Sequence, residues 1–191
     1  MSISKKAIGV AVVILICLGF AHCRRQAHKL RPFKMFRCEE GRFSVLFPGN
    51  RKKGSGPLST PQGDIDFVMY RVKAYGLTIA ISFGDYPKQA MESYSAEEIL
   101  SGFTEPLVKD TKDRVVWKSS EDFHGYPARA FKVNSVRKNK RVIMRVRFIL
   151  IENRIYCLSV ACRSEDALDK YAPKFFESFR VDGVGEDVID Y

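Results

Sequence analysis

The chain has 191 residues and a formal net charge of +10 at pH 7, which by itself could indicate a nucleic-acid partner. The position of the charge argues against such a partner. Eight basic residues and no acidic residue precede residue 38, whereas residues 38–191 carry 24 basic and 22 acidic side chains. About 150 residues follow the basic part, the size of one domain, and five irregularly spaced cysteines exclude a disulfide-rich scaffold.

An unbroken apolar run extends from Ala7 to Ala21, between Lys5-Lys6 and a second basic segment. A basic start followed by an apolar stretch and small residues is typical of an export or anchoring signal. The run is shorter than the roughly 20 residues that cross a bilayer as a helix. Residues 1–23 are therefore predicted to be a signal peptide or a membrane anchor.

Three fates remain open for this segment. Gly19 and Ala21 provide the small residues that a signal peptidase accepts. Cys23 is a candidate for lipidation, although His22 stands before it where a small residue is expected. Without cleavage, residues 3–23 form an apolar helix in the membrane. All three place the protein at a membrane or in the cell envelope, and the flanking charges leave its side of the membrane open.

Residues 24–41 are interpreted as a basic linker, residues 42–182 as the folded domain and residues 183–191 as an acidic tail. Within the domain, an alternating strand at 42–47 precedes a Gly- and Pro-rich stretch, 50–63, that is typical of a surface loop. The next two expected strands, 65–72 and 77–83, should pair as an antiparallel hairpin.

A helix is predicted to begin after Ser95, whose hydroxyl precedes Glu97 and Glu98, and Pro106 is expected to kink or interrupt it. A second helix should begin after Ser164. Between the helices, the alternation predicts an antiparallel meander of four strands, at residues 114–119, 128–136, 141–152 and 154–162.

Together these elements predict an α+β fold in which an antiparallel sheet of about six to seven strands is covered by helices, preceded by the amino-terminal apolar helix. Several patterns along the chain carry a family resemblance: RFSVLFPG (42–49), TPQG (60–63), ISFGDYP (81–87), FHGYPARAF (123–131) and LIENRIYCLSV (150–160). In their order they resemble the small PsbP-like domains of bacterial envelope proteins. The resemblance implies an α/β/α sandwich that binds larger assemblies and brings no shared catalytic residues.

Few residues in the domain suggest chemistry. Asp64 and Asp66 alternate onto one side of a strand start, and His124 is the only histidine after His28, in a turn beside Gly125. These three residues are the candidates for a small hydrolase or a cation-dependent enzyme, with local hydrogen bonding in the turn as the alternative for His124. No cofactor or multi-histidine metal site is predicted.

One basic cluster lies inside the domain without an intervening carboxylate. It is interpreted either as a charged hairpin that protects a strand edge or as a patch for anionic lipid, polymer or an acidic protein face. The cluster consists of Arg137, Lys138, Lys140, Arg141, Arg145 and Arg147.

Two local expectations complete the sequence-based picture. Trp117 is expected to be buried or half-buried on the strand face that it shares with Val115. Cys157 and Cys162 are five residues apart on one strand, so they should face opposite sides and stay unbonded to each other, while a bridge from Cys38 to either remains open.

The favoured function is that of a non-catalytic protein- or ligand-binding domain of a membrane-associated or exported protein, with another protein or component of the cell envelope as partner and no nucleic acid. The small hydrolase or cation-dependent enzyme and the sensor of anionic lipid or polymer remain the alternatives.

Overall fold

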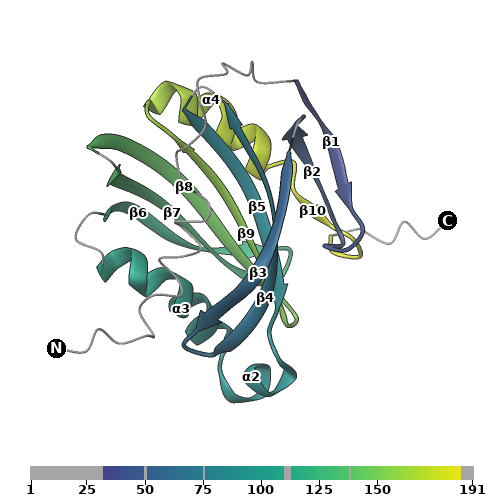
Figure 1. Cartoon of the computed structure of the whole chain (residues 1–191). Helices are drawn as coiled ribbons and strands as arrows, with labels where there is room; N and C mark the ends of the chain where they lie inside the picture. The colour runs from purple at the N-terminus through teal and green to yellow at the C-terminus, as the bar shows by residue number, and fades with distance from the viewer. Residues whose placement is uncertain (1–31, 50, 75, 110–112, 138, 186–191) are drawn as a thin grey trace.

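The computed structural model describes residues 32–49, 51–74, 76–109, 113–137 and 139–185 (Figure 1). Segment 1–23 with Cys23, the expected amino-terminal helix and Lys138 of the basic cluster lie outside these residues. Within the described ranges, no helix combines the length and the apolarity that a membrane crossing requires.

In the described residues, seven strands form one antiparallel sheet, so the predicted α+β class and strand number are confirmed. The strand order is β3-β4-β5-β9-β8-β7-β6. The strands are β3 (Lys52–Thr60), β4 (Gly63–Ala74), β5 (Leu77–Asp85), β6 (Asp113–Phe123), β7 (Tyr126–Arg137), β8 (Lys140–Ile151) and β9 (Arg154–Cys162). Neighbours in space are neighbours in sequence except at the centre, where β9 pairs with both β5 and β8.

A second, three-stranded sheet was not anticipated. It consists of β1 (Phe33–Cys38), β2 (Phe43–Pro48) and β10 (Arg180–Val181), with β2 in the middle. Residues 33–38 had been interpreted as part of the basic linker 24–41, and that interpretation is wrong for them. The charges of Lys34 and Arg37 concealed the inward alternation of Phe36 and Cys38, both of which are buried.

Strand β3 replaces most of the surface loop expected at 50–63. Gly54, Gly56 and Pro57 gave this segment the composition of a loop, but they are tolerated here because β3 is an edge strand. Proline lacks the N–H that a central strand must donate on both sides. Most of β3 is exposed, and its pairing with β4 holds it in place.

The helices are α2 (Lys88–Ser93), α3 (Ala96–Lys109) and α4 (Glu165–Phe176). The predicted caps of α3 and α4 are confirmed. Ser95 Oγ accepts the Glu98 N–H at 3.3 Å while Glu98 Oε2 accepts the Ser95 N–H at 2.8 Å, and Ser164 Oγ accepts the Ala167 N–H at 3.2 Å. The interruption expected at Pro106 does not occur, since α3 continues to Lys109.

Two cores lie on opposite faces of the large sheet, with α2 and α3 on one side and α4 with the small sheet on the other (Figure 1). Strand β8 shows the division: Met144 and Phe148 belong to the core under α3, whereas Ile143 and Ile149 belong to the core under α4. This is the alternation that the sequence predicted. The result is a sandwich of helices around a sheet, with the small sheet added to one outer layer.

The three cysteines of the described residues are buried, and none of them forms a disulfide within these residues. Cys157 lies in the core under α3 and Cys162 in the core under α4, so the prediction that they face opposite sides is confirmed. The bridge from Cys38 that the sequence left open is not formed.

Candidate functional site

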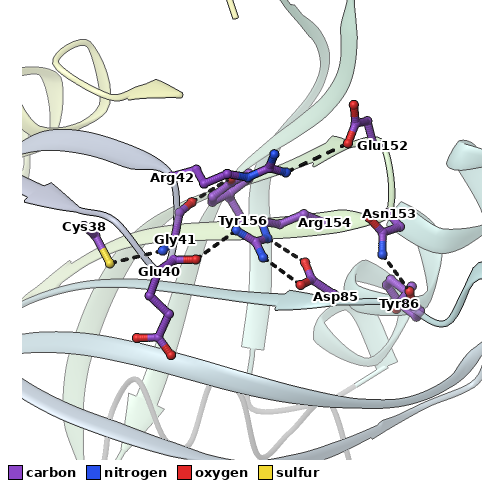
Figure 2. A network of polar contacts seen from close by, with 10 residues as sticks. All are labelled: Cys38, Glu40, Gly41, Arg42, Asp85, Tyr86, Glu152, Asn153, Arg154 and Tyr156. Atoms are coloured by element: carbon purple, nitrogen blue, oxygen red, sulfur yellow. Dashed lines mark hydrogen bonds and ion pairs between the residues drawn. The ribbon is translucent and has the colours of Figure 1, made fainter. Parts of the chain in front are cut away.

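A polar network joins the small sheet to the large one where the start of β9, the end of β5 and the turn between β1 and β2 meet (Figure 2). At its centre, the Arg154 guanidinium donates to both carboxylate oxygens of Asp85, from Nε to Oδ1 at 2.5 Å and from Nη2 to Oδ2 at 2.6 Å. The Arg154 side chain is 13% exposed and that of Asp85 47%. The hydrogen bonds to Asp85 hold the pKa of Arg154 above its ordinary value.

Arg154 also contacts the turn of the small sheet and an aromatic ring of β5. Its Nη1 donates to the Glu40 carbonyl at 3.1 Å, and the guanidinium carbon lies 5.4 Å from the centre of the Phe83 ring. Beside it, the Tyr156 hydroxyl donates to the Gly41 carbonyl at 2.9 Å, and burial raises the pKa of Tyr156. Both bonds run from β9 to the turn between β1 and β2.

Tyr86 and Asn153 close the network on the side of α2. The Tyr86 N–H donates to the Asn153 carbonyl at 2.8 Å, and Asn153 Nδ2 donates back to the Tyr86 carbonyl at 3.0 Å. The Tyr86 hydroxyl donates to Thr60 Oγ1 at 3.2 Å, and burial raises the pKa of Tyr86 to about 12. These bonds fix the exit of β5 against the turn between β8 and β9.

Two residues of the network have left-handed backbones, Arg42 with φ 51° and Glu152 with φ 53°. Their side chains form an ion pair with Arg42 Nη2 at 3.9 Å from Glu152 Oε2. In the same turn as Arg42, the Gly41 N–H donates to Cys38 Sγ at 3.4 Å. The left-handed conformation is uncommon for residues other than glycine, so both turns depend on their surroundings.

Three of the sequence patterns that carry the family resemblance meet in this network. Arg42 opens RFSVLFPG, Asp85 and Tyr86 belong to ISFGDYP, and Arg154 lies in LIENRIYCLSV. No buried nitrogen or oxygen in the side chains of the ten residues in Figure 2 lacks a partner. Because the buried donors and acceptors satisfy one another, the network holds the two sheets together.

The structure separates the three residues proposed for catalysis. Asp64 and Asp66 are exposed on β4, whereas His124 lies in the turn between β6 and β7. Four strand spacings of about 4.8 Å, or about 19 Å, separate β4 from β7. A general base must reach its proton within hydrogen-bond distance, so the three residues do not form one site. In the described ranges, no three His, Cys, Asp or Glu residues lie close enough together to hold a metal ion.

His124 serves the turn itself. It has φ 52° and Gly125 has φ 85°, the two positive angles of a tight hairpin turn. Asp122 Oδ1 accepts the Gly125 N–H at 2.8 Å. The backbone conformation of the turn accounts for the position of His124, while the hydrogen bond across the turn joins its neighbours Gly125 and Asp122.

Three arginines of the basic cluster are neutralised within the domain. Arg145 Nη2 lies 3.1 Å from Asp169 Oδ1, Arg141 Nη2 lies 3.6 Å from Glu165 Oε1, and both acids belong to α4. The third, Arg147, pairs through Nε with Glu121 Oε2 of β6 at 2.8 Å. Of the cluster's other members with described side chains, Lys140 is exposed. The acidic partners of these arginines lie outside the hairpin, so the sequence of the hairpin alone did not predict the ion pairs.

One small apolar cavity lies between β3, β4, β5, β9 and α3, lined by Leu58, Phe67, Phe103 and Ile155 around Gly84. Its volume is about 20 Å³. That is room for about one water molecule, and the walls offer almost no polar surface to bind one. This cavity does not hold a metabolite.

The edge strand β6 of the large sheet carries two exposed large apolar side chains. Val116 and Trp117 are 50% and 48% exposed, and β7 is the one described strand that pairs with β6. The pairing shifts by one residue between Val115 and Trp117, so Val115 lies opposite Val133 and Trp117 opposite Lys132. Val115 packs on the core under α3 and Trp117 lies on the other face. The expectation that Trp117 shares a strand face with Val115 is wrong, because strand alternation does not reveal a bulge.

Comparison with known proteins finds solved structures with a similar fold. No protein-family model and no curated protein sequence matches the chain. Among solved structures, cyanobacterial PsbP (CyanoP) from Synechocystis sp. PCC 6803 is similar with a TM-score of 0.52 at 10% identity, over 83% of this chain and 98% of CyanoP.

Two further structures match less closely. LpqN of Mycobacterium tuberculosis, described as involved in cell envelope biogenesis, gives a TM-score of 0.45 at 10% identity, over 73% of this chain and 90% of LpqN. The Saccharomyces cerevisiae Ran-binding protein Mog1p gives a TM-score of 0.43 at 12% identity, over 80% of this chain and 96% of Mog1p.

Proposed function

We propose that this chain, whose domain has the PsbP-like fold, is a non-catalytic binding protein of the membrane or cell envelope that engages another protein through the edge of β6. The fold by itself carries no activity, so the proposal rests on surfaces of this chain. We call the exposed residues Val116, Trp117 and Lys118 the β6 edge.

The observation that carries the proposal is the exposure of Val116 and Trp117 on an edge strand. An edge strand presents backbone N–H and C=O groups that an extended segment of a partner can pair with. Tryptophan is among the residues that contribute most to binding energy in protein interfaces. The bulge between Val115 and Trp117 places the indole outside the core, where a partner can cover it.

Two observations favour binding over catalysis. Asp64 and Asp66 lie on β4, about 19 Å in strand spacings from the strand that follows His124. The buried polar atoms of the network around Arg154 and Asp85 are all paired, and the apolar cavity near Gly84 has room for about one water molecule.

The location in the membrane or cell envelope, which we call the address, is proposed from the sequence. The apolar run 7–21 and the basic residues that follow it are typical of a segment that exports a protein or anchors it in a membrane. Basic residues beside such a segment are attracted to anionic lipid. Fractionation of native cells tests the address, with recovery in the soluble cytoplasmic fraction as the result that would contradict it.

A photo-crosslinking amino acid at position 116 tests the partner surface in native membranes. We expect one crosslinked protein from position 116 and none from position 94, where Tyr94 is 38% exposed at the end of α2 and serves as the matched apolar control. Equal crosslinking from both positions would mean non-specific contact.

The partner identified in this way is then purified and its affinity measured. Trp117→Ala should weaken binding by at least about tenfold, because removing a central interface tryptophan costs about 2 kcal/mol or more. Tyr94→Ala should leave the affinity unchanged. An unchanged affinity for Trp117→Ala, with an unchanged melting temperature, would remove the β6 edge from the interface.

A further inference from the structure

A second surface lies where the described chain begins. Phe33 starts β1 beside α4, at the same end of the molecule as that helix (Figure 1). Its ring stacks on Tyr171 of α4 with the centroids 6.1 Å apart. The next outward-facing residue of β1, Met35, is 62% exposed, the largest exposure of any large apolar side chain in the described residues.

Two lysines lie beside the Phe33 and Tyr171 rings, and an arginine lies on the other face of β1. Lys174 Nζ lies 5.5 Å from the centre of the Phe33 ring, and Lys170 Nζ lies 5.5 Å from that of Tyr171. On the inner side of β1, the Arg51 guanidinium lies 3.9 Å from the centre of the Phe36 ring. Aromatic rings attract cations through their faces and hold them near an apolar surface.

None of these cations is neutralised in the way that the arginines of the basic hairpin are. Within the described part of the chain, Lys34, Arg51, Lys170 and Lys174 are all exposed and form no ion pair with a carboxylate. We call this group the amino-terminal surface. It consists of Phe33, Lys34, Met35, Arg51, Lys170 and Lys174.

The length of the segment before Phe33 limits how far this surface can lie from the apolar run. Residues 22–32 connect Ala21, the end of the apolar run, to Phe33, and they reach no farther than about 40 Å even when fully extended. Those residues include Arg24, Arg25, Lys29 and Arg31, so the basic character is continuous from the apolar run to the surface.

The geometry points to an anionic lipid bilayer as the occupant of the amino-terminal surface. Uncompensated cations around exposed apolar side chains are the composition that binds anionic headgroups and inserts shallowly between them. The bilayer is also the surface that the proposed anchor holds within reach. This inference rests on the proposed membrane address but not on the β6 edge.

The inference assigns the domain an orientation. The start of β1 and the face of α4 that bears Lys170 and Lys174 lie against the headgroups. The lipid contact predicted for Arg141, Arg145 and Arg147 is thereby replaced, since those arginines are paired with Glu165, Asp169 and Glu121.

Depth-dependent quenching in lipid nanodiscs tests the orientation with the full chain. Cys17 and Cys23 are replaced by Ser, and a fluorophore is attached at Met35→Cys or, in a second protein, at Lys118→Cys of β6. The three remaining cysteines are buried and stay unlabelled in the folded protein. The discs contain phosphatidylcholine alone or an equal mixture with phosphatidylglycerol, each with a lipid-borne quencher.

We expect the label at position 35 to be quenched several-fold more strongly than the label at position 118, and only when phosphatidylglycerol is present. The fourfold variant K34E/R51E/K170E/K174E should lose this quenching, because each cation near an anionic surface is worth about a fivefold change in partitioning. High salt should reduce it by screening.

A charge-matched control separates this surface from general basicity. The variant K88E/R114E/K118E/K140E, examined with the label at position 35, makes the same change in net charge at exposed positions and should keep the quenching. Equal quenching in both kinds of disc, or the same loss in both fourfold variants, would overturn the inference. A chain recovered from native cells in the soluble cytoplasmic fraction would contradict the proposed address, while quenching in the discs decides this inference separately.

Discussion

Arg154 and Asp85 are 69 residues apart in sequence and form a two-point ion pair that joins the first residue of β9 to the last residue of β5. The guanidinium also reaches the Glu40 carbonyl in the small sheet. The Arg154 side chain therefore links β9, β5 and the turn of the small sheet, and it is mostly buried.

Replacement of Asp85 should destabilise the domain more than replacement of an exposed carboxylate. Asp85→Ala leaves the Arg154 guanidinium largely buried without its partner, and we expect the free energy of unfolding to fall by about 2–4 kcal/mol. Asp66→Ala removes an exposed carboxylate from the neighbouring strand β4 and should change it by less than about 0.5 kcal/mol. Urea denaturation measures both, and equal losses would contradict a structural role for the pair.

The raised pKa of Tyr86 predicts a loss of stability in alkali. The folded state holds the Tyr86 proton to about pH 12, whereas the unfolded chain releases it near 10.0. The stabilisation is therefore complete below about pH 10 and is lost as the pH rises toward 12, at about 1.4 kcal/mol for each pKa unit.

Tyr86→Phe isolates this contribution. The variant should lose about 1 kcal/mol at pH 9 with its hydrogen bond to Thr60, and then fall less steeply than the wild type between about pH 10 and 12. Urea midpoints across this range give the comparison, in which Tyr156 titrates equally in both proteins. Identical slopes would show that Tyr86 is not the group responsible.

Gly84 is required by the close approach of two strands. A Cβ at this position would lie 2.7 Å from the backbone oxygen of Asp66, so Gly84→Ala should cost about 1–3 kcal/mol through displacement of β4 or β5. Gly54→Ala, in the exposed strand β3 where a Cβ meets nothing within 4 Å, should be neutral or slightly stabilising. Thermal unfolding distinguishes the two, and a neutral Gly84→Ala would refute the steric argument.

The turn at His124 predicts the outcome of a substitution that removes the imidazole. His124→Asn creates the Asn-Gly pair that two-residue hairpin turns prefer, so stability should be retained or slightly raised. Gly125→Ala should lower it by about 1 kcal/mol, because Gly125 has φ 85°. A large loss in His124→Asn, by calorimetry, would indicate that the imidazole has a role beyond the turn.

Local patterns were enough for the elements whose burial alternates or whose ends carry a cap. The bounds of β9 were predicted without error, since Arg154 to Cys162 is an apolar strand that follows a turn. Strands β1 and β3 were missed because edge strands are stabilised by their partners and carry the residues of linkers and loops, such as Lys34 and Pro57.

The site was less predictable than the fold because its geometry is made by contacts distant in sequence. The sequence around Arg154 does not indicate that Asp85 is its partner. The sequence of the basic hairpin likewise does not indicate that Glu165 and Asp169 of α4 form ion pairs with Arg141 and Arg145. The sequence patterns that carry the resemblance include both Asp85 and Arg154, so they did mark the segments that meet in the network.

The central place of β9 also fixes when the domain can form during synthesis. Ile81 of β5 pairs with Leu158, so β5 keeps an open apolar edge until the ribosome has made β9. Any nascent chain that ends before this strand holds two separate half-sheets, β3-β4-β5 and β6-β7-β8, without the strand that joins them. Such long-range pairing is slow, so the complete seven-stranded sheet can form only after β9 has been synthesised.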